Sequence, residues 1–168
     1  MWNPPLALTS EEQKIAARTR RRGSFFVFLR EHRHELLDTD FQHTLAQSYS
    51  PEPGDPEPVE AGLLALATLL QAYGHVSDRD AVELSVMDKR WQMVLDCLGA
   101  EQPPCSQGTL FNFQMRLITH NVDKTLLDRT VALAEHTGGF GARQLRAVLD
   151  STPLCGASRV EDTLHLLG

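Results

Sequence analysis

Hydrophobic side chains recur along most of the chain at the three- and four-residue spacing of amphipathic helices. Residues 24–37 show the pattern clearly, with Phe25, Phe28, Leu29 and Leu36 on one predicted face. The other stretches with helical character are residues 10–23, 40–48, 59–73, 77–87, 88–98, 106–119 and 121–137. The pattern predicts a mainly α-helical bundle over residues 10–138, preceded by a flexible N-terminus at residues 1–9.

Ser10, Ser77 and Ser106 stand where three of these helices begin, and serine is a preferred helix N-cap. The stretch at residues 59–73 is apolar on nearly all sides, which predicts a helix at the centre of the core. Residues 50–58, just before it, hold four prolines and a glycine. Because proline removes a backbone donor, we expect an exposed loop there.

The pattern changes after Gly141. The run from Leu145 to Leu149 is short and ends in Asp-Ser-Thr-Pro, which favours a strand or hairpin over residues 143–157. A short helix is expected after it, with Ser158 as its cap and Glu161 at the capping-box position. Residues 139–168 therefore read as the start of a second domain.

Composition allows one domain and the beginning of another. The chain has 168 residues, of which 42% are hydrophobic and 23% charged, so a packed core is expected. The net charge of −6 argues against a nucleic-acid binder, but the charges are unevenly spread. Residues 51–105 carry 10 acidic and 3 basic side chains, whereas residues 14–22 carry five basic ones and no acid. One short segment is thus suited to phosphate contact.

That segment contains Arg18, Arg20, Arg21 and Arg22, the main candidates for contact with DNA phosphates. Each phosphate that a cation neutralises releases counterions, which strengthens binding at low salt. The competing interpretation is a solvated helix end, where cations offset the helix dipole. The residues alone do not separate the two.

The chain shows no apolar run long enough to span a membrane and no signal-peptide layout, so a cytoplasmic protein without a membrane partner is expected. Cys97, Cys105 and Cys155 form neither a CxxC pair nor an even set. They are interpreted as buried thiols rather than disulfides or metal ligands.

Three segments in the middle of the chain carry a family resemblance. They read LLQAYGHVSDRDAVEL, KRWQMVLDCLG and PPCSQGTLFNFQMRL. Their order resembles the N-terminal region of InsH-like insertion-sequence transposases, in which a Tyr-Gly-x-Ser-Asp-Arg motif precedes a Trp-containing helix, a proline turn and a Ser-x-x-Thr-Leu-x-x-Phe helix. The later segment VLDSTPLCGASRVEDTLHLLG is similar to that family's first catalytic segment, so the resemblance covers roughly residues 25–168.

The resemblance implies a helix-turn-helix-like DNA-binding part in which residues 106–119 enter the major groove. The polar positions of that helix are the candidate base or phosphate contacts: Gln107, Thr109, Asn112, Gln114 and Arg116. An ordinary solvated helix face is the competing interpretation. DNA contact also requires the acids of the preceding helices, Asp78, Asp80, Glu83 and Asp88, to face away from the duplex.

The resemblance also implies that Asp150 is the first carboxylate of a DDE site, a catalytic residue and metal ligand at the end of a strand in an RNase-H-like domain. Such a site holds two divalent metals, Mg²⁺ by its preference for carboxylates, and needs several acids. The family's second Asp and its Glu lie further downstream, and Glu161 and Asp162 do not match them. This chain is therefore expected to be inactive alone and to hold no cofactor alone. Without the resemblance, an Asp in this place is interpreted as a turn former.

The leading hypothesis is thus a DNA-binding N-terminal portion of a transposase, with double-stranded DNA at terminal inverted repeats as its partner and with itself or the full-length transposase as further partners. The alternative is a helical interaction module that regulates the full-length transposase by mixed oligomerisation. A third hypothesis is an autonomous metal nuclease. That third hypothesis requires magnesium-dependent nicking of DNA that is lost in Asp150→Asn.

Overall fold

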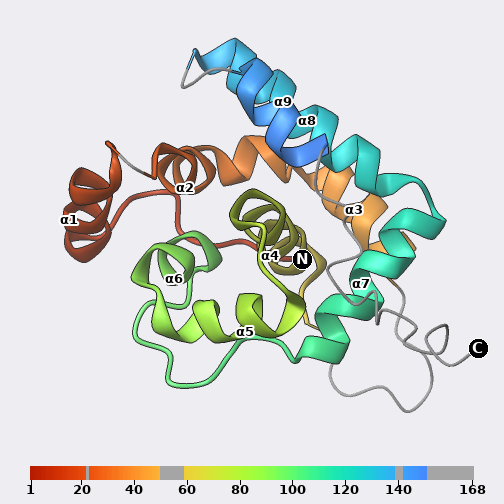
Figure 1. Ribbon diagram of the computed structural model, residues 1–168, viewed down its shortest axis with the longest axis horizontal. Coiled ribbons are helices and arrows are strands. Elements are labelled where there is room, and N and C mark those ends of the chain that lie inside the picture. The colour runs from red at the N-terminus through yellow and green to blue at the C-terminus, as the bar shows by residue number, and fades with distance from the viewer. Residues whose placement is uncertain (22, 50–58, 139–141, 151–168) are drawn as a thin grey trace, which may run out of the picture.

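The computed structural model describes residues 1–21, 23–49, 59–138 and 142–150, which form helices packed around a central one (Figure 1). The helices are α1 Ser10–Thr19, α2 Ser24–Leu36, α3 Thr39–Ser48, α4 Ala61–Gly74, α5 Asp78–Met87, α6 Lys89–Leu95, α7 Gln107–Thr119, α8 Val122–Thr137 and α9 Ala142–Asp150. The prediction of a mainly helical bundle is confirmed over these residues. The proline-rich stretch 50–58 lies outside them.

Helix α4 is the centre of the core. It contacts α3, α5, α6, α7 and α9, and every residue from Leu64 to Ala72 is buried. Phe25 of α2 stacks on Tyr73 near the end of α4, with ring centroids 4.4 Å apart. The predicted core helix over residues 59–73 is therefore confirmed, as expected for a segment with few polar side chains to leave in water.

Helix starts follow the predicted caps with one shift. The side chains of Ser77 and Ser106 accept hydrogen bonds from backbone N–H groups in the first turns of α5 and α7. The N-cap of α1 is Thr9, one residue before the predicted Ser10, because Thr9 and Glu12 form a capping box. Helix α6 ends at Leu95, short of the predicted residue 98, where Asp96 adopts a left-handed conformation at φ 59°.

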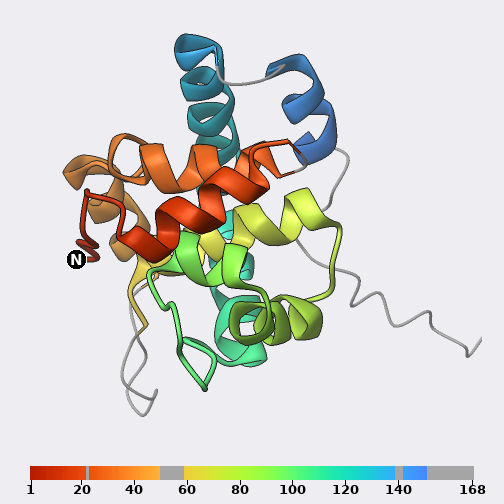
Figure 2. The ribbon, with the colours of Figure 1, turned by 90° about the vertical axis from the view of Figure 1, so that its left-hand side faces the viewer.

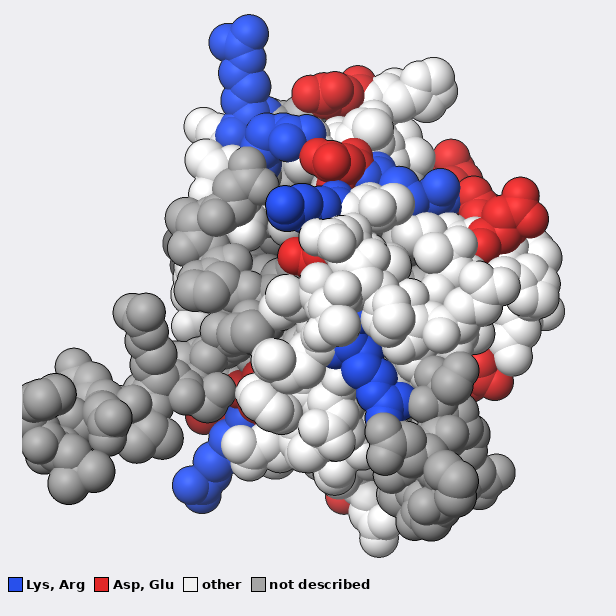
Figure 3. Space-filling view, turned by 90° about the vertical axis from the view of Figure 1, so that its right-hand side faces the viewer, with Lys and Arg blue, Asp and Glu red and all other residues white. Residues whose placement is uncertain are grey.

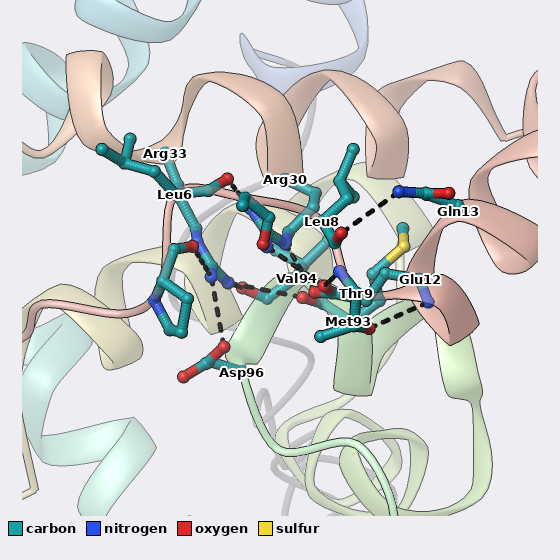
Figure 4. A network of polar contacts seen from close by, with 12 residues as sticks. Leu6, Leu8, Thr9, Glu12, Gln13, Arg30, Arg33, Met93, Val94 and Asp96 are labelled. Carbon is teal, nitrogen blue, oxygen red and sulfur yellow. Dashed lines mark hydrogen bonds and ion pairs between the residues drawn. The ribbon is translucent and has the colours of Figure 1, made fainter.

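Two buried arginines on α2 bind the segment that precedes α1 (Figure 4). The Nε of Arg30 donates to the Oε1 of Glu12 at 2.6 Å, and its terminal nitrogens donate to the carbonyls of Leu6 and Ala7. The side chains of Arg30 and Glu12 are 1% and 4% exposed. Residues 1–9, predicted as a flexible terminus, thus contain no helix but are bound to α2 through their backbone.

The second arginine, Arg33, joins the same segment to the end of α6 (Figure 4). It donates to the carbonyls of Pro5 and Val94, at 2.9 and 3.0 Å, and to the carboxylate of Asp96 at 3.1 Å. Burial and the nearby Arg30 lower the pKa of Arg33 more than Asp96 raises it. A cation beside the last carbonyls of a helix, which have no hydrogen-bond partner within the helix, also offsets the helix dipole.

Residues 142–150 form helix α9, so the predicted strand is wrong over these residues. Leu145 and Leu149 are buried against α4 and α8, and Val148 is half-buried. These three positions follow the helical spacing of three and four, not the alternation of a half-buried strand, and the neighbouring alanine, arginine and glutamine favour helix. The short run before Asp-Ser-Thr-Pro misled the prediction. Residues 151–168, with the expected end of the hairpin and the helix after Ser158, lie outside the described residues.

Leu149 is expected to hold α9 in place. A nine-residue helix is not stable alone in water, so its stability depends on the packing of its apolar side. Removing a fully buried leucine side chain costs about 2–5 kcal/mol. We expect Leu149→Ala to abolish hydrogen-exchange protection of the amides at 146–150 while α4 keeps its protection. Unchanged protection in this variant, with Ala147→Ser as the exposed control, would refute the docking of α9.

Candidate nucleic-acid interface

Helix α7 is present as predicted for the helix at residues 106–119, and it has one buried and one exposed side. Leu110, Phe113 and Leu117 are at most 1% exposed and face the core. The first turn is fixed by Ser106, whose Oγ accepts from the backbone N–H of Thr109 at 3.1 Å. The opposite side therefore has a defined orientation. Met115 is 38% exposed and lies on this outer side.

Three of the predicted contacts reach the surface near the start of α7. Gln107 and Asn112 are exposed, and Thr109 is half-buried, with its hydroxyl 2.8 Å from the Oγ of Ser106. Glutamine and asparagine side chains can donate and accept at once, which suits them to the edge of adenine in the major groove. This part of the sequence prediction agrees with the placement of the side chains.

Gln114 is wrongly predicted as a DNA contact, because it is 1% exposed. Its Nε2 donates to the Oε1 of Gln71, and the Nε2 of Gln71 donates to the Oδ1 of Asp78 at 2.6 Å. Position 114 lies three and four residues from Leu117 and Leu110, which places it on the buried side of the helix. These polar side chains join α7 to α4 and α5, and they fix how α7 is turned.

Arg116 lies at the edge of the exposed side. Its guanidinium stands 5.2 Å from the centroid of the Tyr49 ring, at the end of α3, and the side chain is half-buried. Such a cation–π contact holds the charge beside an aromatic face. Arg116 is therefore positioned by α3 before any partner binds.

The arginines of the N-terminal segment lie on the other side of the molecule from α7. Arg18, Arg20 and Arg21 are exposed at the end of α1, and Arg22 lies outside the described residues. Figures 1 and 2 agree that α2, α4 and α6 stand between α1 and α7. The structure therefore does not bring the two predicted groups of DNA contacts into one surface.

The surface around α7 has little charge at its centre. Figure 3 views the side on which α7 and the start of α8 lie, and uncharged side chains fill much of the middle, with most charged groups in the upper part and a basic side chain across the lower middle. On α5, which packs against α7, Asp78 is buried while Arg79, Asp80 and Glu83 are exposed. Of the four acids that must face away from DNA, Asp78 is buried, whereas Asp80 and Glu83 remain exposed.

Asp150 is the last residue of α9. The prediction that it ligates a metal depended on a strand ending there, and a helix occupies these residues instead. Within the described ranges, no group of three His, Cys, Asp or Glu side chains lies close enough to hold a metal ion. A two-metal site therefore has no set of donors among these residues.

The two described cysteines are free thiols, and Cys105 is buried as the sequence interpretation expected. Cys105 is 8% exposed and Cys97 is half-buried. Burial, helped by Asp96 for Cys97 and by Cys97 for Cys105, raises the pKa of each thiol to about 11. Both are therefore protonated at neutral pH and are poor nucleophiles. Cys155 lies outside the described residues.

Three comparisons with known proteins give no relative. No family model matches the chain, and neither a curated protein nor a solved structure matches it. In the described part of the chain, no helix combines the length and apolar content needed to cross a membrane.

Proposed function

We propose that this chain is the DNA-binding N-terminal portion of an insertion-sequence transposase, and that α7 is the helix that enters the major groove. The observation that carries the proposal is the pair of exposed amide side chains, Gln107 and Asn112, on the first turns of a capped helix. In helix-turn-helix proteins the start of the reading helix presents such side chains to base edges.

The placement of the motif residues supports the proposal. Gly74 ends α4, Ser77 caps α5, and Asp78 is bonded to Gln71 of α4, so the segment YGHVSDR at residues 73–79 forms the joint between these helices. Ser106 and Phe113, from the second quoted motif, cap α7 and anchor it in the core. A motif used in this way keeps α7 in a fixed orientation on α4 and α5.

The proposal does not include catalysis. In a complete transposase, Asp150 would be the first carboxylate of an RNase-H-like domain, and residues 142–150 would have to leave α9 and pair as a strand. The helix seen here speaks against that role within this chain. We therefore propose DNA recognition without strand cleavage, because two-metal chemistry needs several carboxylates.

Enrichment from a pool of random-sequence 30-base-pair duplexes tests the proposal. We expect the chain to enrich one sequence class, and Asn112→Ala to bind the enriched duplex about tenfold to a hundredfold more weakly, since a good amide–adenine pair contributes about 1–3 kcal/mol. Gln144→Ala, an exposed amide on α9, is the matched control and should bind as the unaltered chain does. A pool with no enriched class after repeated rounds would overturn the proposal.

A second candidate, a protein-interaction module, is favoured by the uncharged middle of the face in Figure 3. On the outer side of α7, Phe111 and Ile118 are half-buried and Met115, which lies three or four residues from each, is exposed. Apolar side chains surrounded by polar ones are typical of protein contacts. Self-association at micromolar concentration that is weakened by Met115→Glu and unaffected by DNA would favour this candidate over DNA recognition.

A further inference from the structure

The acids of helix α1 are paired with cations on other helices, which its sequence alone does not indicate. It carries two acids in its first turn, but neither leaves a free charge on the outer surface. Glu12 is 3% exposed and bonded to the buried Arg30. Glu11 is bonded to Lys89 of α6, with 2.8 Å between Oε1 and Nζ. The acids of α1 are thus taken up by partners on α2 and α6.

What remains on the outer side of α1 is a row of cations. Lys14 and Arg18 are exposed and lie four residues apart on one side of α1, and Arg21 is exposed two residues beyond the end of the helix. None of the three forms an ion pair with any residue that the structure describes. We refer to Lys14, Arg18 and Arg21 as the α1 cationic row. Lys14 was not among the predicted contacts, although its spacing from Arg18 was visible in the sequence.

The acids next to the α1 cationic row are neutralised as well. Helices α2 and α6 pack against α1. Glu31 of α2 pairs with Arg20 at 3.3 Å, and Asp88 at the start of α6 pairs with Arg90. Glu11, Glu12, Glu31 and Asp88 therefore each have a cationic partner, and the row is left as excess positive charge on a protein of net charge −6. A concentrated charge of one sign attracts counter-charged partners over several ångströms.

We infer that the α1 cationic row binds the phosphate backbone of a nucleic-acid duplex at a surface separate from α7. From Lys14 to Arg18 the helix rises about 6 Å, close to two phosphate steps of one strand, and Arg21 extends the row past the end of α1. No aromatic side chain stands among its members, so it has nothing on which an unpaired base would stack. The exposed residues between them, Ala17 and Arg20, offer no large apolar group for insertion into a membrane.

The position of the row adds to this inference. Because α1 and α7 lie on opposite sides of the molecule, one straight duplex cannot lie against both (Figures 1 and 2). The row therefore acts on its own, without sequence preference. If α7 reads DNA as proposed above, one molecule contacts two duplex segments at once. That last step depends on the proposed function, whereas the row itself does not.

The test compares Arg18→Gln/Arg21→Gln with Arg143→Gln/Arg146→Gln, which removes two exposed arginines from α9. Binding of the full chain to a random-sequence 30-base-pair duplex is measured by fluorescence anisotropy from 50 to 200 mM salt. We expect the α1 variant to bind about tenfold or more weakly at the lowest salt, with the slope of log K against log salt smaller by about 2. The α9 variant should retain both the affinity and the slope of the unaltered chain.

Equal slopes for the unaltered chain and the α1 variant, or equal losses in both variants, would overturn the inference. The inference would also be overturned if Arg18→Gln/Arg21→Gln weakened binding to phosphatidylserine vesicles more than it weakened binding to the duplex. Failure of the proposed function has another signature. The role of α7 in DNA recognition would be refuted if no sequence class were enriched, or if Asn112→Ala bound the enriched duplex as tightly as the unaltered chain. The α1 variant would still show a smaller slope of log K against log salt. All variants change exposed side chains, so equal thermal unfolding confirms that each is folded.

Discussion

Replacing Glu12 by alanine is expected to lower the free energy of unfolding by about 3–5 kcal/mol, because it leaves the buried guanidinium of Arg30 without its carboxylate. The two side chains are nearly inaccessible to water, and Arg30 donates to both oxygens of Glu12. The variant also loses the carboxylate that accepts the backbone N–H of Thr9 at 2.7 Å. Urea unfolding followed by circular dichroism measures the loss, which is a large share of a typical domain stability of about 5–15 kcal/mol.

Glu11→Ala is the control, because it removes the neighbouring acid on the same helix turn. Glu11 also forms an ion pair, with Lys89, but its side chain is 55% exposed. Exposed ion pairs contribute about 0–1 kcal/mol, since water screens them and two flexible side chains must be ordered. Equal urea midpoints for Glu11→Ala and Glu12→Ala would show that burial of the Glu12–Arg30 pair has no energetic consequence.

The same pair makes stability depend on pH in a defined direction. Burial alone would raise the pKa of Glu12, but hydrogen bonds from Arg30 and Thr9 outweigh it, so the pKa lies below its ordinary value of 4.5. The unfolded chain therefore binds a proton at a pH where the folded chain does not. The stabilisation is complete above about pH 4.5 and is lost as pH falls through the lower folded pKa. The stability gap between the unaltered chain and Glu12→Gln should narrow over that acid range.

The sequence allowed the helices to be placed, because their apolar spacing and serine caps are local signals. Helices α4 and α7 lie where their patterns predicted them, and Ser77 and Ser106 cap as expected. The buried charges were not predictable in this way. Arg30, Arg33 and Glu12 are residue types that are almost never buried unless paired, and their partners lie on other elements. Only the packing of α1, α2 and α6 brings them together.

The candidate site was predicted in part for a similar reason. Listing the polar positions of α7 includes Gln107 and Asn112, which are exposed, but also the buried Gln114, whose partner Gln71 is 43 residues away in sequence. Polarity was taken to mean exposure, whereas helical position relative to Leu110 and Leu117 decides it. The prediction of a strand at α9 failed because a short apolar run does not distinguish strand from helix by itself. The packing of α9 against α4 and α8 favours the helix.

Phe113→Ala is the second substitution for which we expect a large effect, about 3–5 kcal/mol of unfolding free energy. Phe113 is fully buried, and its ring meets that of Tyr49 edge-on, with centroids 5.3 Å apart. The substitution leaves a cavity between α7 and α3 that neighbouring side chains can fill only in part. Phe111→Ala, on the same helix but half-buried, should cost about 1 kcal/mol, in proportion to the apolar area that it removes from contact.

Adjacent positions on α7 then separate folding from recognition. Asn112 is exposed and touches no part of the core, so Asn112→Ala should leave the urea midpoint unchanged while it weakens binding to the enriched duplex. Phe113→Ala should lower the midpoint, and its DNA affinity should fall only by the fraction of molecules that are unfolded, since the contacting side chains remain. If Phe113→Ala abolished binding under conditions where it is fully folded, the orientation of α7 would depend on this ring more than on the Gln71–Gln114 bond.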